Sequence, residues 1–334
     1  MLIFMLIPPL LKANMHSDAS VAYREGLANV TAKEYSKAVD NFSKAIEIDP
    51  LYGEAFFHRG LTYDLLGDFE NAAKDFFKAF EINPKSIYAV SHLAMEEEKL
   101  GMYHKAIKYF SQAIVLDSND LDFYTRRALV KYNIGDFATS LIDFEHILQK
   151  FPSFTDVRLH KAQCLFELKQ YAEALIQFDM VVSENPNDAN ALVKRGKVKA
   201  ALNNHTSAII DYTKAIAMEE DVYDYYLFRA ESEFLIGNNQ NGIVDCDKAI
   251  SIDNFMAEAY LLRAKIYDSV GKSVFSIEDC SKILENIPNH KEALWARAQY
   301  RIKVKDHVGA CSDLTEALQL GEMAAETLMK KYCK

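Results

Sequence analysis

The sequence predicts an all-α protein, an α-solenoid with two helices per repeat, and three observations support this. A 34-residue period runs nine times from Ala19 to Ala324 without an insertion, and a fixed period of this length is typical of a solenoid. Each period contains two stretches of helical periodicity with a turn between them. From Ala19 onward no proline lies inside a predicted helix, where it would interrupt the backbone hydrogen bonds.

The second half of each repeat has a small, large, small pattern. A mostly small residue stands at the twentieth place, a mostly large one at the twenty-fourth and a mostly small one at the twenty-seventh, as in Ala72, Phe76 and Ala79. These places share one helix face, because side chains three and four residues apart stack on one another. The small residues therefore allow a neighbouring helix to approach closely, and the large residue fills the space between the helices.

The first half of each repeat has a second helical pattern, with Gly or Ala at the eighth place. A turn follows, which in five repeats contains a glycine: Gly67, Gly101, Gly135, Gly237 and Gly271. Glycine suits the left-handed residue that ends a helix. Five repeats close on a proline just past the second helix: Pro50, Pro84, Pro152, Pro186 and Pro288.

This arrangement of small, aromatic and proline positions resembles the tetratricopeptide repeat (TPR). The clearest copy, residues 53–86, has Gly60, Tyr63, Gly67, Ala72, Phe76, Ala79 and Pro84 in place. The resemblance covers 306 of the 334 residues. It implies antiparallel helix hairpins that stack into a right-handed TPR superhelix, with the first helix of each hairpin lining a concave groove. It also implies binding of protein or peptide.

We expect three parts in the chain. Residues 1–18 form an apolar amino-terminal extension, residues 19–324 form the repeats, and residues 325–334 form a short capping helix. Stacked repeats can bury one continuous core, so we expect one elongated domain. The repeats are 19–52, 53–86, 87–120, 121–154, 155–188, 189–222, 223–256, 257–290 and 291–324.

The extension leaves three alternatives open. Residues 1–14 are a secretory signal or anchor, a segment that packs over the first hairpin, or an upstream extension before initiation at Met15. A secretory signal would have a basic start and a small-residue cleavage site, and neither is evident. No run of eighteen apolar residues exists, so no membrane span is expected.

The five cysteines form no CxxC motif and no disulfide framework. Four of them fall on packing columns, where free cysteine behaves as a small hydrophobic residue: Cys164, Cys246, Cys280 and Cys311. This pattern predicts a reducing compartment and therefore a cytoplasmic location. A secretory or anchored location through residues 1–14 is the alternative.

Charge and motifs favour a protein that is not an enzyme. The net charge of −10 argues against nucleic acid as a partner, since phosphates require basic surface. The chain has no phosphate-binding glycine loop, HExxH motif, nucleophile elbow or kinase signature. The acidic run Glu96-Glu97-Glu98 is not expected to bind metal, because consecutive helix residues point in different directions. We expect no catalytic residue, cofactor or metal.

Six repeats combine an arginine at the seventh place with an aspartate at the twenty-third. The arginines are Arg59, Arg127, Arg195, Arg229, Arg263 and Arg297, and the aspartates are Asp75, Asp143, Asp211, Asp245, Asp279 and Asp313. The other three repeats lack both residues. This joint occurrence predicts contact across each hairpin, because the arginine fork matches a carboxylate. We interpret the pairs as structural.

The TPR pattern places the second, fifth, sixth, ninth, twelfth and thirteenth residues of each repeat on the concave side. The sixth place carries Arg24, His58, His92, Arg126, His160 and Lys194, and then Phe228 and Leu262. The fifth place adds Tyr23, Phe57, Leu159, Leu227, Leu261 and Trp295, residue types that can anchor a partner. This basic and then apolar ladder would suit an acidic, partly apolar segment.

An alternative interpretation is that three of these charges are neutralised within their own helices. The pairs would be Glu54–His58, Asp122–Arg126 and Asp156–His160, each four residues apart.

We therefore expect a non-enzymatic scaffold or adaptor that binds a peptide segment, or one subunit of a multiprotein assembly, in its groove. The alternative is a chaperone-linked TPR receptor or co-chaperone. Its carboxylate-clamp motif needs Lys at the fifth place and Asn at the ninth, where this chain has pairs such as Tyr23/Leu27 and Phe57/Leu61. Self-association through a thinly capped carboxyl-terminal end is a further expectation.

Overall fold

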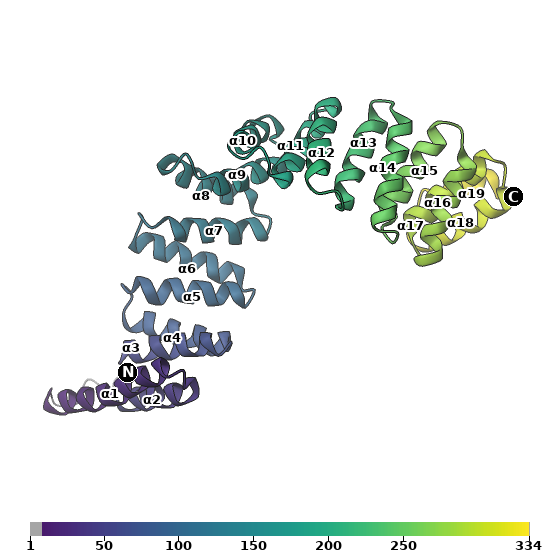
Figure 1. Cartoon of the computed structure of the whole chain (residues 1–334). Helices are drawn as coiled ribbons and strands as arrows, with labels where there is room; N and C mark the ends of the chain where they lie inside the picture. The colour runs from purple at the N-terminus through teal and green to yellow at the C-terminus, as the bar shows by residue number, and fades with distance from the viewer. Residues whose placement is uncertain (1–8, 334) are drawn as a thin grey trace. The chain divides into compact units, whose positions relative to one another are not determined.

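The computed structural model describes the backbone of residues 9–333 and the side chains of residues 17–333. This part of the chain consists of nineteen α-helices without a strand, which confirms the expected all-α solenoid (Figure 1). The chain divides into two units, Met1–Leu168 and Lys169–Lys334, and each is described by itself. The expected single continuous domain of nine repeats stays a prediction.

The helices have nearly constant lengths and follow the 34-residue period. The first unit contains α1 (Pro9–Thr31), α2 (Tyr35–Ile48), α3 (Gly53–Leu65), α4 (Phe69–Ile82), α5 (Ile87–Lys99), α6 (Tyr103–Leu116), α7 (Leu121–Asn133), α8 (Phe137–Lys150) and α9 (Thr155–Glu167). The second contains α10 (Tyr171–Glu184), α11 (Ala189–Ala201), α12 (His205–Met218), α13 (Tyr223–Leu235), α14 (Asn239–Ile252), α15 (Ala257–Ser269), α16 (Ser273–Asn286), α17 (Lys291–Lys303), α18 (His307–Gln319) and α19 (Ala325–Tyr332). Within each unit every helix packs against the next one in the chain.

The small and large columns form the core of each hairpin. A Cβ atom added to Gly60 on α3 would lie only 2.9 Å from the ring of Phe76 on α4, so the eighth and twenty-fourth places are in direct contact. The twentieth place lies between the first helix of its own hairpin and the following hairpin: a Cβ on Gly242 would lie 3.2 Å from the backbone oxygen of Ala230 and 2.9 Å from Ile266. The column aromatics are fully buried, Phe76 among them. The small residues thus set how closely the helices approach.

The turn inside each hairpin requires a left-handed residue at the same place in every repeat. Five repeats supply glycine there, for example Gly67 with φ of 77°. The other four supply Lys33, Lys169, Asn203 and Lys305, with φ between 60° and 64°. The left-handed conformation costs a residue with a Cβ about 1–2 kcal/mol, which the packing of the two helices must offset.

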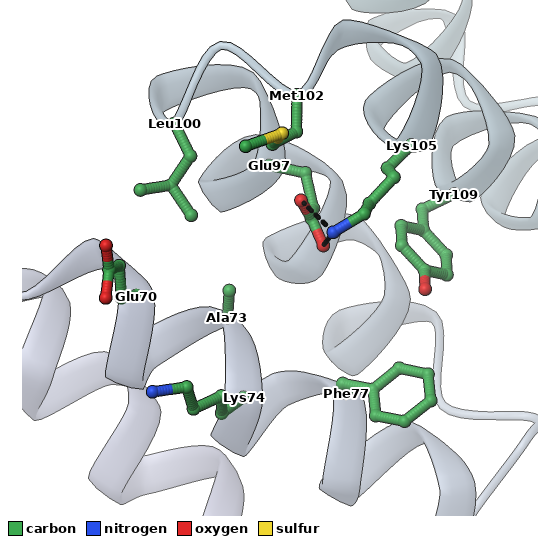
Figure 2. A pocket seen from close by; sticks show the side chains of 9 residues that line it. All are labelled: Glu70, Ala73, Lys74, Phe77, Glu97, Leu100, Met102, Lys105 and Tyr109. Carbon is green, nitrogen blue, oxygen red and sulfur yellow. Dashed lines mark hydrogen bonds and ion pairs between the residues drawn. The ribbon is translucent and has the colours of Figure 1, made fainter.

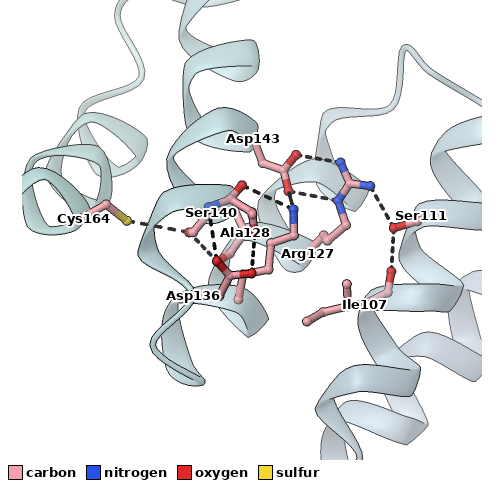
Figure 3. Close-up of polar contacts among 10 residues, drawn as sticks. Ile107, Ser111, Arg127, Ala128, Asp136, Ser140, Asp143 and Cys164 are labelled. Carbon is pink, nitrogen blue, oxygen red and sulfur yellow. Dashed lines mark hydrogen bonds and ion pairs between the residues drawn. The ribbon is translucent and has the colours of Figure 1, made fainter. Parts of the chain in front are cut away.

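The six predicted arginine–aspartate pairs are confirmed as two-point hydrogen bonds within each hairpin. Arg127 Nε donates to Asp143 Oδ2 at 2.9 Å and Arg127 Nη2 to Oδ1 at 2.6 Å (Figure 3). The remaining nitrogen, Nη1, donates to Ser111 Oγ of the preceding hairpin at 2.8 Å. The same bond recurs from each arginine to Ser43, Ser111, Asp179, Thr213, Asp247 or Ser281. Each arginine therefore joins two hairpins.

The aspartates of these pairs differ in whether a second cation reaches them. Lys131 Nζ lies 2.9 Å from Asp143 Oδ2, and two other pairs have the equivalent contact, from Lys199 to Asp211 and from Arg301 to Asp313. Within residues 17–333 the other three aspartates have one ion-pair partner each: Asp75, Asp245 and Asp279.

The amino-terminal part of α1 departs from the expected boundary. Residues 9–18, assigned to the extension, are the first turns of α1 and continue into the first repeat. The structure does not describe residues 1–8, or the side chains of residues 9–16, so the three alternatives for residues 1–14 lie outside the described residues and stay predictions. The segment 325–334, where a capping helix is expected, contains α19, which packs on α18.

The expectation that Cys311 is free is wrong. Cys311 on α18 forms a disulfide with Cys333, which directly follows α19, and the two Cα atoms are 5.6 Å apart. The reason is the return of α19 along α18, which the repeat pattern does not encode. Cys164, Cys246 and Cys280 are free and buried, as expected.

Candidate functional site

The candidate site lies on the face that the second, fifth, sixth and ninth places of the first helices form, here named the first-helix face. In the first unit its predicted residues include a row of touching rings. Tyr23 Oη lies 3.1 Å from His58 Nδ1, and the ring centroids of Phe57 and His92 are 5.4 Å apart. Burial raises the pKa of Tyr23 to about 12. These rings link α1, α3 and α5 into one aromatic surface.

The predicted basic ladder is largely engaged within its own helices. Arg126 Nε donates to Asp122 Oδ2 at 2.7 Å, so this neutralising pair is confirmed. His58 Nδ1 and His160 Nδ1 instead lie 3.0 and 2.8 Å from the backbone oxygens of Glu54 and Asp156. The proposed carboxylate pairs at these two histidines are therefore wrong, because each ring lies against the backbone carbonyl one helical turn earlier.

Three further predicted site residues of the first unit are also in contact with neighbours or half-buried: Arg24, His92 and Leu159. Arg24 Nε donates to the backbone oxygen of Ser20 at 3.3 Å. His92 packs between Phe57 and Phe76, and this burial lowers its pKa below the usual 6.5. Leu159 is half-buried.

In the second unit the predicted anchors are half-buried among their neighbours. Phe228 contacts Tyr212, with ring centroids 6.0 Å apart, and Lys197 Nζ lies 4.7 Å from the Phe228 ring centroid. Burial lowers the pKa of Lys194. Trp295 packs against the cluster that contains Ala325 of α19. The remaining predicted anchors each pack against a core cluster: Leu227, Leu261 and Leu262.

Two adjoining cavities open on the first-helix face of the first unit, and both are lined by Tyr88 of α5. The first, between α3 and α5, measures about 490 Å³, includes Tyr52, Glu54 and Phe57, and is named the aromatic cavity. The second, between α5 and α7, measures about 350 Å³ and is named the acidic cavity after its aspartates. Of the predicted site residues, Phe57 lines the aromatic cavity and Arg126 the acidic one.

Sequence reasoning missed most of the acidic cavity. Its carboxylates are Asp117, Asp120 and Asp122, and its exposed aromatic residue is Tyr88. Asp122 and Tyr88 occupy the second place of their repeats, which the TPR pattern assigns to the concave side, so this column could have indicated them. Asp117 and Asp120 lie in the connection between repeats, where no helical periodicity predicts their orientation.

A third cavity, of about 510 Å³, lies away from the predicted site residues, between α4 and the hairpin α5–α6 (Figure 2). It lies where the arginine series is interrupted, since the seventh place here is Leu93 and the twenty-third is Tyr109. Phe77 stands at the twenty-fifth place, where other repeats have a small polar residue such as Ser111 that accepts from the arginine of the next hairpin. Together with Tyr109 it lines the cavity. The cavity therefore lies beside a hairpin that lacks the arginine–aspartate pair.

Two further findings concern ions and membranes. Among the described residues no group of three or more His, Cys, Asp or Glu side chains is arranged to hold a metal ion. No helix in the described part of the chain is long and apolar enough to cross a membrane.

Comparisons with known proteins agree with this architecture. Sequence models of the tetratricopeptide repeat match residues 53–86, 89–120, 134–202 and 189–222. A tetratricopeptide repeat protein from Parabacteroides merdae has a similar fold, with a TM-score of 0.56 and 18% identity over 70% of this chain and 92% of that one.

A second solved structure, YrrB, is described as a TPR protein with an unusual peptide-binding site. It has a TM-score of 0.50 and 21% identity, covering 58% of this chain and 97% of its own. A comparison with curated proteins finds no match. The matching repeats, the helix pairs and the shared fold lead to one conclusion: the chain belongs to the tetratricopeptide repeat family.

Proposed function

We propose that this protein is a non-enzymatic scaffold or adaptor that binds a peptide segment of a partner along the first-helix face of its first unit. The observation that carries the proposal is the pair of adjoining cavities that Tyr88 joins. A binding site is concave and combines apolar surface with polar groups that orient the ligand, and both cavities are lined by residues of the two kinds. The bound segment would belong to one subunit of a larger assembly. The aromatic surface of Tyr23, Phe57 and His92 extends the site towards α1.

The proposal can be tested through Tyr88, whose side chain is 74% exposed and makes little contribution to the core. Tyr88→Ala should remove partners from a quantitative affinity purification of the full chain, and crosslinks to those partners should map to α3, α5 and α7. Phe255→Ala is the matched control, because Phe255 is an aromatic residue of the second unit with 70% exposure. Equal partner recovery from both variants would contradict the proposed site.

The cytoplasmic location is a separate proposal, for which the chain supplies a sensitive reporter. In a reducing compartment the Cys311 and Cys333 thiols are expected to be free, whereas an oxidising compartment would keep them bonded. Trapping thiols with an alkylating reagent at the moment of cell lysis would reveal the state of this pair by mass. Quantitative protection of both cysteines would argue against the cytoplasmic proposal.

A further inference from the structure

The acidic cavity has a specific chemical character that the predicted basic ladder did not suggest. Its apolar walls come from α5 and α7 and include Ile87, Met95 and Phe123. Three carboxylates and one guanidinium line it: Asp117, Asp120, Asp122 and Arg126. Since Arg126 is bonded to Asp122 at 2.7 Å, two negative charges are left over.

The two remaining carboxylates are held in place by backbone groups and not by cations. Asp117 Oδ1 accepts from the backbone N–H of Asn119 at 2.9 Å, and Asp120 Oδ1 accepts from that of Asp122 at 2.9 Å. Both side chains are half-buried, and neither has an ion-pair partner within residues 17–333. Half-buried carboxylates interact with a cation more strongly than fully hydrated ones, because less water screens the charges.

The geometry selects an organic cation over a metal ion. The aspartates are not grouped in a way that could hold a metal. The cavity of about 350 Å³ has apolar walls that suit the methylene stem of a long side chain. Tyr88, which lines the cavity, adds an exposed aromatic ring, and a cation over such a ring is attracted by its electron-rich face.

We propose that the acidic cavity binds an arginine or lysine side chain of an extended, basic peptide segment, whose neighbouring apolar side chain enters the aromatic cavity. The inference rests on the proposed function, since it gives the chemistry of the partner at the same face. Charge complementarity supports it beyond one cavity: the two cavities together carry four carboxylates, Glu54 among them, and one guanidinium. For the first unit, the partner segment proposed here is basic, in place of the acidic segment that the basic ladder suggested.

The test uses the full chain and a library of fluorescein-labelled hexapeptides. Each pool has one fixed residue at the third position (Arg, Lys, citrulline, Leu or Glu) and a mixture of Ala, Leu, Ser and Tyr elsewhere. Fluorescence anisotropy should show the tightest binding for the Arg and Lys pools. Citrulline keeps the shape of arginine without its charge, and we expect it to weaken binding about tenfold or more, as for the loss of a charged hydrogen bond.

The matched variants remove charge without removing the local hydrogen bonds. Asp117→Asn with Asp120→Asn should weaken binding of the Arg pool about tenfold or more, because each asparagine oxygen can still accept its backbone N–H. The control is Asp188→Asn with Asp253→Asn, which occupy the same two places in repeats of the second unit. Asp253 Oδ1 accepts from the backbone N–H two residues on, as Asp117 does, and Asp188 Oδ1 accepts from the backbone N–H of Ala191. The control variant should bind the Arg pool with a Kd within about twofold of that of the parent chain.

The outcomes separate the inference from the proposed function. A preference for the Leu or Glu pools, abolished by Tyr88→Ala, would overturn the basic-side-chain inference and leave the peptide site standing. Equal losses in the two asparagine variants, with folding of both shown by circular dichroism, would also overturn it. Failure of every pool to bind, together with partner recovery unaffected by Tyr88→Ala, would overturn the proposed function itself.

Discussion

Removing the Arg229 guanidinium should destabilise its hairpin more than removing that of Arg127, although the two arginines occupy the same place. Asp245 accepts from Arg229 Nε and Nη2 at 2.8 and 2.6 Å, and it has no other ion-pair partner within residues 17–333. Asp143 has the same two contacts from Arg127 and a third from Lys131. The side chains of Asp245 and Asp143 are 6% and 3% exposed, so neither carboxylate can recover its hydration without movement.

The expected magnitudes follow from these contacts. Removing one partner of a buried ion pair costs about 3–5 kcal/mol, and we reduce this to about 2–4 kcal/mol for Arg229→Ala because the arginine is partly exposed. For Arg127→Ala the carboxylate keeps its bond to Lys131, and we expect about 1–2 kcal/mol, the net value of the lost hydrogen bonds. Replacing both Arg127 and Lys131 with alanine should then cost about as much as Arg229→Ala.

Hydrogen exchange followed by mass spectrometry is the appropriate assay, because a repeat array can open in parts and a single melting temperature would average over them. Exchange is compared between each variant and the parent for the segments 121–154 and 223–256 of the full chain. A loss of 2–4 kcal/mol corresponds to exchange faster by about 30-fold to 1,000-fold. Equal losses for the two single variants, or a double variant no worse than Arg127→Ala, would refute the role of the second cation.

Three other predictions concern single features of the fold. Glu96→Val should stabilise the chain by about 1 kcal/mol at pH 7, because Glu96 is 1% exposed in a column that elsewhere is mostly apolar and its Oε2 has no hydrogen-bond partner in the described part of the chain. This gain is net of the lost ion pair between Glu96 Oε1 and Lys99 Nζ at 2.8 Å. Burial raises the pKa of Glu96 above the unfolded value of 4.5. The charged carboxylate therefore destabilises the folded chain at pH values above the raised pKa, and this cost disappears below pH 4.5, where the group is protonated in both states. Urea titrations should show the stability gain of Glu96→Val shrinking as the pH falls towards 4.5. Reduction of Cys311–Cys333 should accelerate exchange of α19 and leave α13 unchanged, and unchanged exchange of α19 would show that packing alone holds it. NMR titration of His92 should give a pKa below 6.5, and a value above it would show that the ring is not buried as described.

Much of this fold could be predicted from the sequence because nine copies act as an internal alignment. The column pattern identified both helices of every repeat, and the joint occurrence of arginine and aspartate identified a contact 16 residues apart, as between Arg127 and Asp143. Such contacts recur with the period, so a single physical cause is repeated often enough to be visible. The left-handed turn was visible where glycine supplies it, and hidden at Lys33 and the three other residues that adopt it under the packing of their helices.

The candidate site was only partly predictable, because the repeat indicates which residues of the first helices share a face but not which residues line a cavity between them. The first-helix places were found through the repeat, and they include Phe57 and Arg126. The two aspartates that make the second cavity acidic, Asp117 and Asp120, lie in a connection between helices. Other repeats carry aspartate at the same places, as at Asp253 and Asp188, so comparison between copies gives the acidic residues but not the cavity that they line.

The period by itself therefore determined the helices, the hairpin cores and the family of this protein, because a helix face is fixed by residue spacing alone. Beyond the arginine–aspartate pairs, only the tertiary structure decided which groups from different helices come together. It joined each arginine to the preceding hairpin, brought Cys333 back to Cys311, and placed Tyr88 beside Asp117 and Asp120. These contacts depend on the angle and direction at which one helix packs on the next, and that geometry comes from the close approach of whole side-chain surfaces, which spacing along the chain does not specify.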